Sequence, residues 1–208
     1  MLSPFGLSLS KPSPFPRPKE KALRQARGER RKVAQLLLLL LQPHPTSAAE
    51  DVHKISVEAS RSAGLLRLRF IVEARLDRLA IPPPALPRRC ENLWQHSCFE
   101  AFVRAEGREN YVELNFAPSG AWAAYEFEGE RRGMTEADME PCRIQTWSDS
   151  GRLELSAEVE RLPYGEPWRL GLSAVIEHVS GRLSYWALLH PSDEPDFHHP
   201  ESFILALP

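Results

Sequence analysis

The chain has 208 residues, of which 26 are Lys or Arg and 28 are Asp or Glu, so its formal net charge is −2. A balance this close to neutral excludes a uniformly basic nucleic-acid coat protein and an acidic tail protein. The charges are unevenly divided, because residues 1–32 carry nine basic and two acidic side chains and the remainder is net −9. The acidity of that remainder argues against a nucleic-acid or anionic-membrane partner.

Residues 1–32 are predicted to be a disordered tail. They combine five prolines with the Lys/Arg cluster and show almost no apolar periodicity. Such a segment cannot bury enough apolar surface to offset its chain entropy. The alternative is a basic arm for nucleic acid or anionic lipid. We expect the native start near Val33, with one domain over residues 33–208.

The apolar run Leu36–Leu41 has two interpretations. The whole run from Val33 to Leu41, which contains it, is about half the ~20 residues that span a bilayer, so no membrane span is predicted. We favour a fully buried first β-strand ended by Pro43. The alternative is the hydrophobic region of a signal peptide, since Arg30–Lys32 precede it and Ser47-Ala48-Ala49 resembles a cleavage site.

Cysteine usage bears on the compartment. Three cysteines without a C-x-x-C pair are too few and too scattered for a disulfide framework, namely Cys90, Cys98 and Cys142. They indicate reduced thiols and a cytoplasmic protein. If Leu36–Leu41 is a signal region instead, the protein is exported.

From residue 50 onward the hydrophobic pattern has a period near two, which is typical of half-buried β-strands. No segment offers a convincing amphipathic helix of ten residues, although 134–140 could form one helical turn. Many short strands at hairpin spacing predict an all-β fold, an antiparallel β-sandwich of jelly-roll or immunoglobulin-like type. Pro82–Pro87 predict an extended crossover between its two parts. The expected strands are 36–41, 54–59, 66–73, 97–104, 110–117, 121–128, 141–148, 152–159, 168–178, 182–189 and 202–207.

Two of these strands carry polar side chains where core residues would be expected. Glu100 lies between Cys98 and Phe102 in a largely apolar segment. The strand at 111–116 presents Tyr111, Glu113 and Asn115 on one face. An aromatic ring beside carboxylate and amide groups suits a hydroxyl-rich ligand. The alternative is a structural carboxylate held by an arginine, because buried carboxylates must be paired or hydrogen-bonded.

Four blocks in order carry a family resemblance: LWQHSCFEAFV (93–103), YVELNFAPSGAWAAYEF (111–127), GLSAVIE (171–177) and SYWALLHPSDEPDFHHPESFIL (184–205). They resemble the bacterial DOMON-like group, which is related in fold to carbohydrate-binding module family 9. The likeness covers about residues 36–207. It implies a single β-sandwich with a face that, in related modules, binds sugars or haem.

A sugar site needs flat aromatic faces and polar groups that fix hydroxyls. The predicted ligand-binding residues are Trp94, Glu113, Asn115, Trp122, Tyr125, Trp186 and His190, with Asp196 and His198 as further hydrogen-bonding candidates. The resemblance implies a pair of tryptophans around a terminal sugar, and we assign Trp122 and Trp186 to that role. The alternative for each tryptophan is a place in the core.

No cofactor is predicted. Haem ligation, which the resemblance allows, would have to use Met134 or Met139, and no haem attachment motif is present. A calcium site is compatible with the carboxylate-rich loop that also holds Asp193 and His199, but its spacing matches no zinc signature. The alternative is a proline-stiffened loop that ties the last strand to the sheet.

These observations predict a ligand-binding module for a carbohydrate or a sugar-containing small molecule. One alternative is a structural or interaction domain without a small ligand. Another is an enzyme acting on a cell-envelope sugar, for which Glu100 and Glu113 are the only carboxylate pair in view. No nucleophile with an identifiable base is apparent. The sequence leaves the oligomeric state open.

Overall fold

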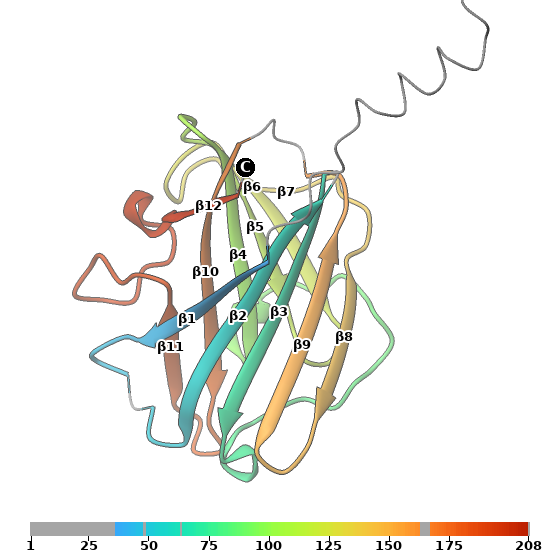
Figure 1. The fold of residues 1–208 in the computed structure, drawn as a ribbon, viewed down its shortest axis with the longest axis vertical. Helices are drawn as coiled ribbons and strands as arrows, with labels where there is room; N and C mark the ends of the chain where they lie inside the picture. The colour runs from blue at the N-terminus through green and yellow to red at the C-terminus, as the bar shows by residue number, and fades with distance from the viewer. Residues whose placement is uncertain (1–35, 48, 63, 163–166, 208) are drawn as a thin grey trace, which may run out of the picture. The chain divides into compact units, whose positions relative to one another are not determined.

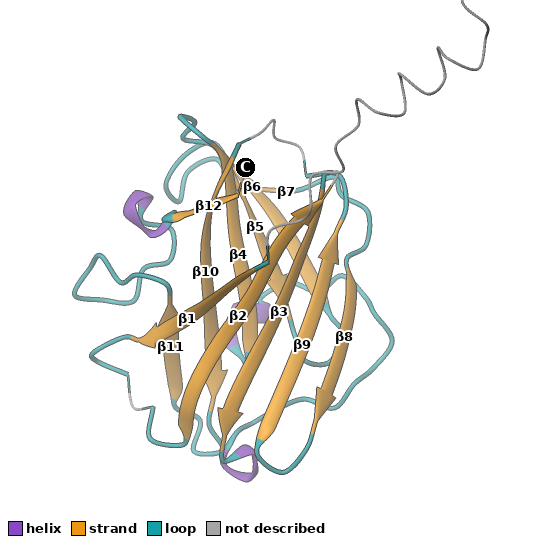
Figure 2. Ribbon diagram, in the orientation of Figure 1, coloured by secondary structure: helices purple, strands orange, loops and turns teal. Residues whose placement is uncertain are grey.

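The computed structural model describes residues 36–47, 49–62, 64–162 and 167–207. The predicted tail at 1–32 lies outside these residues. The described chain is built from β-strands and short 3₁₀ turns, so the all-β antiparallel class is confirmed (Figure 2). Its 3₁₀ turns are η1 (Leu76–Arg78), η2 (Leu93–Gln95) and η3 (Pro200–Ser202). No described helix is long and apolar enough to span a bilayer.

The strands fall close to the predicted segments, with ends that differ by a few residues. The exception is the two-residue strand β7, where the sequence predicted a helical turn at most. The strands are β1 (Leu37–Pro43), β2 (Val52–Ser62), β3 (Leu65–Ala74), β4 (Cys98–Ala105), β5 (Tyr111–Phe116), β6 (Trp122–Phe127), β7 (Thr135–Glu136), β8 (Arg143–Ser148), β9 (Arg152–Val159), β10 (Trp168–Glu177), β11 (Leu183–Ala187) and β12 (Leu205–Leu207).

All twelve strands belong to one antiparallel sheet in the order β7-β6-β5-β4-β10-β11-β1-β2-β3-β9-β8, with β12 paired to β10. Strand β1 is the joint, because Leu37–Leu41 pair with β2 whereas Gln42 and Pro43 pair with β11. The sheet curls there, so that β2, β3, β9 and β8 lie in front of β10, β4, β5 and β6 (Figure 1). We call the first group half A and the second, with β11 and β7, half B.

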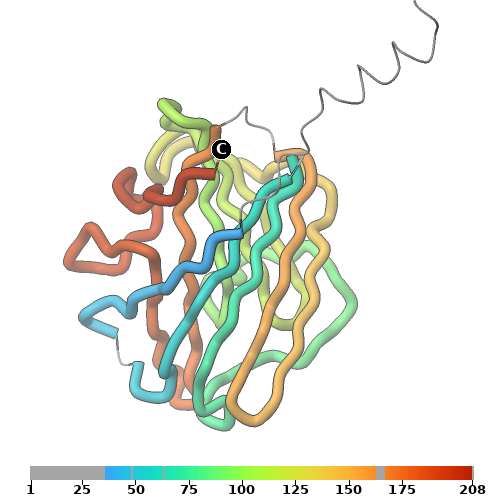
Figure 3. Tube along the Cα trace, viewed as in Figure 1, coloured from blue at the N-terminus to red at the C-terminus, as the bar shows by residue number. Residues whose placement is uncertain are grey.

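The core lies between the two halves. Alternate residues of each strand point into it, as the period of two requires. Phe70 of β3 and Phe99 of β4 meet across the gap with ring centroids 5.0 Å apart, and both are fully buried. Figure 3 shows the traces of the two halves lying one over the other. Half B therefore has a second face that points away from this core.

The proline-rich segment carries the chain from half A to half B. It follows η1 after β3 and runs without helix or strand to η2 before β4. Leu79 at its start bridges to His178, and Arg89 bridges to Trp122. The expected crossover is therefore present. The chain reaches half B beside Trp122 of β6 and then continues through η2 into β4.

The apolar run forms a strand, but the prediction that this strand is fully buried was wrong. Leu37 and Leu39 pack against the core and Leu41 is buried, whereas Leu38 is 70% exposed and Leu36 and Leu40 are exposed as well. A run of identical leucines gives the same side chain to both faces of a strand. Periodicity therefore could not show that one face is open.

A matched pair of leucines tests this placement of the core. Leu68 of β3 is 2% exposed, and Leu38 is the exposed counterpart on β1. We expect Leu68→Ala to lower the free energy of unfolding by about 2–5 kcal/mol, because the cavity left in the core closes only in part. Leu38→Ala should change it by less than ~1 kcal/mol. Urea unfolding of both variants checks this, and equal losses would contradict the placement of β1.

Candidate functional site

A cleft of about 790 Å³ opens on the outer face of half B. Its floor is formed by β4, β5 and β6, and its walls come from the loops around η2, around Arg131 and around Pro195, together with β11. The side chains on it are mainly aromatic and acidic: Trp94, Glu100, Phe102, Glu113, Tyr125, Phe127, Tyr185, Glu194, Phe197 and His198, with Arg131 and Met134 at the rim.

Strand register explains which side chains meet on the floor. Glu113 lies opposite Phe102 of β4 on one side and Tyr125 of β6 on the other. Glu100 lies opposite Asn115 of β5 and Ser173 of β10. The two glutamates are therefore diagonal neighbours on adjacent strands, within reach of each other's side chains.

Hydrogen bonds hold both carboxyl groups in place. Asn115 Nδ2 donates to Glu113 Oε1 over 2.6 Å, and the Cys98 thiol donates to Asn115 Oδ1 over 3.4 Å. Ser173 Oγ donates to Glu100 Oε2 over 2.9 Å. The floor residues under the glutamates are thus polar and mutually satisfied.

Burial governs the protonation of the pair. Desolvation raises the pKa of Glu100 to about 8, and the charge of Glu113 adds to the rise, while the Ser173 hydrogen bond and the charge of Arg131 oppose it. Burial also raises the pKa of Glu113, against the Asn115 hydrogen bond and Arg131. Two neighbouring buried carboxyls cannot both ionise at low cost. The pair therefore retains a proton at pH 7.

His198 lines the cleft from the loop around Pro195 and contacts both Tyr111 and Glu113. Desolvation lowers the pKa of His198 to about 4, so its ring is neutral at pH 7. Its Nδ1 lies 2.7 Å from the Tyr111 hydroxyl, which accepts from the Arg131 backbone N–H over 3.3 Å. If the hydroxyl donates to Nδ1, the ring proton is on Nε2, 3.7 Å from Glu113 Oε2. The histidine then presents a donor toward the glutamate.

The loop that carries His198 is fastened to the sheet at several points. Asp196 accepts from Arg131 over 2.8 Å, and the Arg104 guanidinium lies 4.3 Å above the Phe203 ring. Gly171 of β10 lets this loop approach, since a Cβ there would lie 3.2 Å from the Ser202 carbonyl oxygen. These contacts tie the loop to β4, to β10 and to the loop around Arg131.

Backbone conformation at the rim is unusual. Among the described residues, only Asn92, Arg131 and Arg161 combine a side chain with a positive φ, and the first two line the cleft, at 58° and 51°. Left-handed backbone is disfavoured for residues with a Cβ, and such residues gather at binding and catalytic sites.

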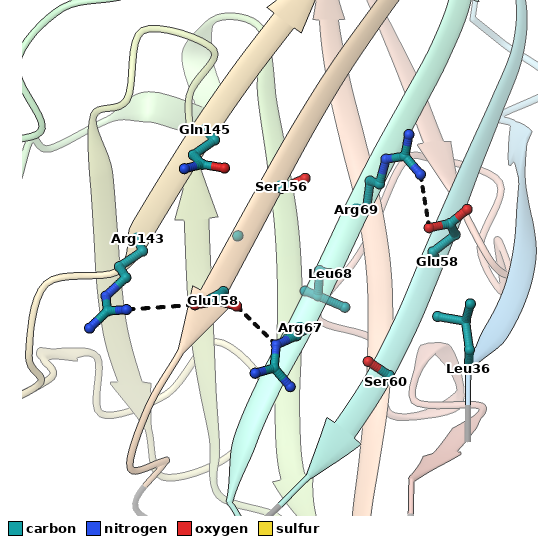
Figure 4. A pocket seen from close by; sticks show the side chains of 11 residues that line it. Leu36, Glu58, Ser60, Arg67, Leu68, Arg69, Arg143, Gln145, Ser156 and Glu158 are labelled. Atoms are coloured by element: carbon teal, nitrogen blue, oxygen red, sulfur yellow. Dashed lines mark hydrogen bonds and ion pairs between the residues drawn. The ribbon is translucent and has the colours of Figure 1, made fainter. Parts of the chain in front are cut away.

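The outer face of half A offers a contrast. A smaller hollow of about 460 Å³ lies there, and Figure 4 shows acidic and basic side chains alternating across its strands. Arg69 reaches Glu58 at 3.2 Å and Glu154 at 2.6 Å, and Arg67 reaches Glu158 at 2.9 Å. Each of these partly exposed glutamates is compensated by an arginine. Neither Glu100 nor Glu113 has an arginine within 4.0 Å in the described chain, although the structural alternative expected one.

Of the predicted ligand-binding residues, Trp94, Glu113 and Tyr125 line the cleft together. Trp94 is 48% exposed, and it belongs to η2, which precedes β4. Asn115 is fully buried on the same face of β5 as Glu113 and donates to it, but it does not line the cleft. Both further candidates, Asp196 and His198, belong to the covering loop.

The remaining predicted residues lie elsewhere. Trp122 and Trp186 are each 4% exposed in the core between the halves, so they cannot enclose a sugar. Alternation along the strands explains this placement. Trp122 lies on the opposite face of β6 from Tyr125, and Trp186 lies on the opposite face of β11 from Tyr185, so both tryptophans point into the core. His190 Nε2 donates to the Gln42 carbonyl over 2.9 Å, which fastens the loop to the end of β1.

Several cleft residues were not among the predicted ligand-binding residues. Glu100 was singled out as a polar residue in an apolar strand and as a possible partner of Glu113, but not as a ligand-binding residue. Phe102, Arg131, Tyr185 and Phe197 were not proposed as ligand-binding residues. The parity of β4 places Phe102 beside Glu100 and so could have indicated it. Arg131 and Phe197 lie on loops, where the two-residue alternation of a β-strand does not predict which way a side chain points. In the described part of the chain, no group of three or more His, Cys, Asp or Glu side chains is placed to hold a metal ion.

Comparison with known proteins identifies a fold. No protein-family profile matches the chain, and no curated protein sequence matches it. A crystal structure from Bacteroides uniformis ATCC 8492, named as a "putative carbohydrate-binding protein", is similar with a TM-score of 0.59. The similarity covers 90% of this chain and 89% of that one at 13% sequence identity. At that identity the likeness shows that the two chains share a fold.

The buried glutamate gives a prediction about stability. The folded pKa of Glu100, about 8, lies above its ordinary value of 4.5, so folding retains a proton that the unfolded chain loses. Its contribution to stability is complete below about pH 4.5 and is lost as the pH rises through 8. Relative to wild type, Glu100→Gln should gain stability over this window by up to ~1.4 kcal/mol per pH unit.

Urea unfolding of wild type and Glu100→Gln between about pH 5 and 9 measures this difference. Glu158→Gln is the matched control, because Glu158 is partly exposed on half A and paired with Arg67. A constant difference between wild type and Glu100→Gln across the range would show that Glu100 is ionised throughout.

Proposed function

We propose that this protein is a ligand-binding β-module whose outer-face cleft on half B takes a carbohydrate or a sugar-containing small molecule. The observation that carries the proposal is the half-exposed ring of Trp94 in the same cleft as the buried carboxyl of Glu113. An aromatic ring offers a flat apolar surface to a pyranose, and convergent polar groups fix its hydroxyls.

The size and composition of the cleft support this proposal. Its volume of about 790 Å³ falls in the range of small-molecule sites, about 300–1,000 Å³. The walls provide aromatic rings from three separate elements, and Arg131, His198 and Glu194 provide polar groups. The shared fold with a protein named as carbohydrate-binding is a further argument, as is the resemblance of four sequence blocks to the DOMON-like group and to the β-sandwich of carbohydrate-binding module family 9.

Binding is favoured over hydrolysis by the placement of the two glutamates. Both stand on the floor of the cleft, on adjacent strands of one face. Glycosidases of the two-carboxylate type need these groups on either side of the bond that breaks. Here both would approach a ligand from one side, which suits recognition of a functional group rather than acid–base cleavage.

A structural domain without a ligand is disfavoured by the same pair. A domain that only needed stability would fill this floor with apolar or ion-paired side chains, because uncompensated buried carboxyls are destabilising. The outer face of half A follows the paired pattern, and the cleft of half B does not.

A glycan panel tests the proposal. Neutral and amino monosaccharides and disaccharides at millimolar concentration should change the intrinsic tryptophan fluorescence for at least one member, because Trp94 is half exposed in the cleft. Trp94→Ala should lower the affinity for that sugar about tenfold or more, as expected for loss of an aromatic anchor. Titration calorimetry measures the variants, since Trp94→Ala removes the tryptophan that reports from the cleft.

Trp147→Ala is the matched control, because Trp147 is similarly exposed, at 54%, on β8 of half A. It should bind the sugar as wild type does. The proposal fails if no sugar gives a response, or if Trp94→Ala and Trp147→Ala bind equally well.

A further inference from the structure

The cleft floor contains two buried acidic groups and lacks a cation to match them. Glu100 is 2% exposed and Glu113 is 6% exposed. Within the described residues, His198 is the one basic side chain within 4.0 Å of either carboxyl, and its ring is neutral at pH 7. Arg131 influences both groups from the rim, but its guanidinium is bound to Asp196 and its side chain is 58% exposed. The floor therefore has acidic groups for which the protein supplies no close counter-charge.

The aromatic side chains of the cleft stand beside these acidic groups. In the row of the sheet that crosses Glu113, the neighbours are Phe102 and Tyr125. Phe127 and Tyr185 line the same cleft from β6 and β11. The face of an aromatic ring attracts a cation in addition to packing against apolar surfaces. This cation–π attraction is stronger where water is excluded. Carboxyl groups flanked by rings provide the surroundings in which an ammonium group is bound.

We propose that the cleft selects a sugar carrying a free primary amine, whose ammonium group lies between Glu100 and Glu113. This inference rests on the proposed function and adds the chemical group that the floor recognises. An ammonium has three N–H donors and no acceptor. The pair carries a proton at pH 7 in the free protein, and the ammonium displaces it to solvent, because a cation beside a buried carboxyl lowers the pKa of that carboxyl. The ionised pair then supplies acceptors on both sides, while the polar groups at the rim remain for the sugar hydroxyls.

The donor set at the floor favours an ammonium over a metal ion. A calcium ion takes six to eight oxygen ligands, and magnesium needs an octahedral set. The floor supplies two carboxyl groups, each already accepting one hydrogen bond, from Ser173 and from Asn115. An ammonium needs no more than three acceptors. The two carboxyl groups supply two of them, and one oxygen of the sugar or of the protein supplies the third.

Four probes separate the parts of this inference: glucosamine, N-acetylglucosamine, glucose and cyclohexylamine, each titrated calorimetrically at about pH 6.5, where a primary amine is largely protonated. Wild type should bind glucosamine about tenfold or more tightly than glucose or N-acetylglucosamine, because a charged hydrogen-bonded pair is added in a buried site. Cyclohexylamine should bind more weakly than glucosamine, since it lacks the hydroxyls.

Three variants locate the preference. Glu100→Gln and Glu113→Gln each remove one carboxyl with little change in shape, and each should reduce the ratio of glucosamine to glucose affinity about tenfold. Glu158→Gln removes a carboxyl from the opposite half and should keep the wild-type ratio. Thermal unfolding verifies that each variant is folded, and if one glutamine variant does not fold, the other carries the test.

The possible outcomes are distinguishable. Equal affinity for glucose, N-acetylglucosamine and glucosamine would overturn the ammonium site and leave the proposed function standing. Cyclohexylamine binding as tightly as glucosamine would overturn the selection of a sugar. No response to any of the three sugars would overturn the proposed function, and this inference with it. A wild-type preference that persists in both glutamine variants would place the ammonium elsewhere.

Discussion

Placing two carboxyl groups side by side on the buried floor of one sheet face is the constraint that organises half B. An ionised carboxylate removed from water is strongly disfavoured unless it is paired or hydrogen-bonded. Here Ser173 and Asn115 each donate to one of the glutamates, and the pair keeps a proton. The neighbouring strands thus need polar residues at those register positions, which is why β5 and β10 interrupt their apolar pattern there.

Both halves place polar side chains on their outer faces by the same alternation along the strands. Whether those side chains are buried depends on the loops that cover the face. The outer face of half A carries no such cover among the described residues, and its partly exposed glutamates and arginines pair across the strands, as at Arg69. Half B is covered by the loop that contains Phe197 and His198 and is bordered by η2. Covering the face excludes water, which raises the pKa of Glu100 and strengthens any interaction with a ligand charge. The cleft is therefore a product of its loops as much as of its strands.

What the sequence could predict follows from the period of two. It identified the strands and the shared face of Tyr111, Glu113 and Asn115, because that signal is local. The same parity, applied to β6 with Tyr125 facing outward, assigns Trp122 to the core, where the structure places it, whereas the family resemblance assigned it to a sugar site. Arg131 and Phe197 lie on loops whose path depends on tertiary contacts such as that between Arg131 and Asp196. The run Leu36–Leu41 has no contrast between its faces, so its exposure could not be predicted.

The unpaired glutamates bear on function because stability alone does not account for them. Apolar residues at 100 and 113 would extend the aromatic cluster of Phe102, Tyr111 and Phe127 without any desolvated charge. The chain instead combines a buried acidic pair with left-handed backbone at Asn92 and Arg131 along the same cleft. Departures from local consistency that gather in one place are typical of functional sites, where part of the stability is given up for recognition. A ligand that supplies the missing positive charge would remove the electrostatic penalty of the floor, so binding and stability would then rise together.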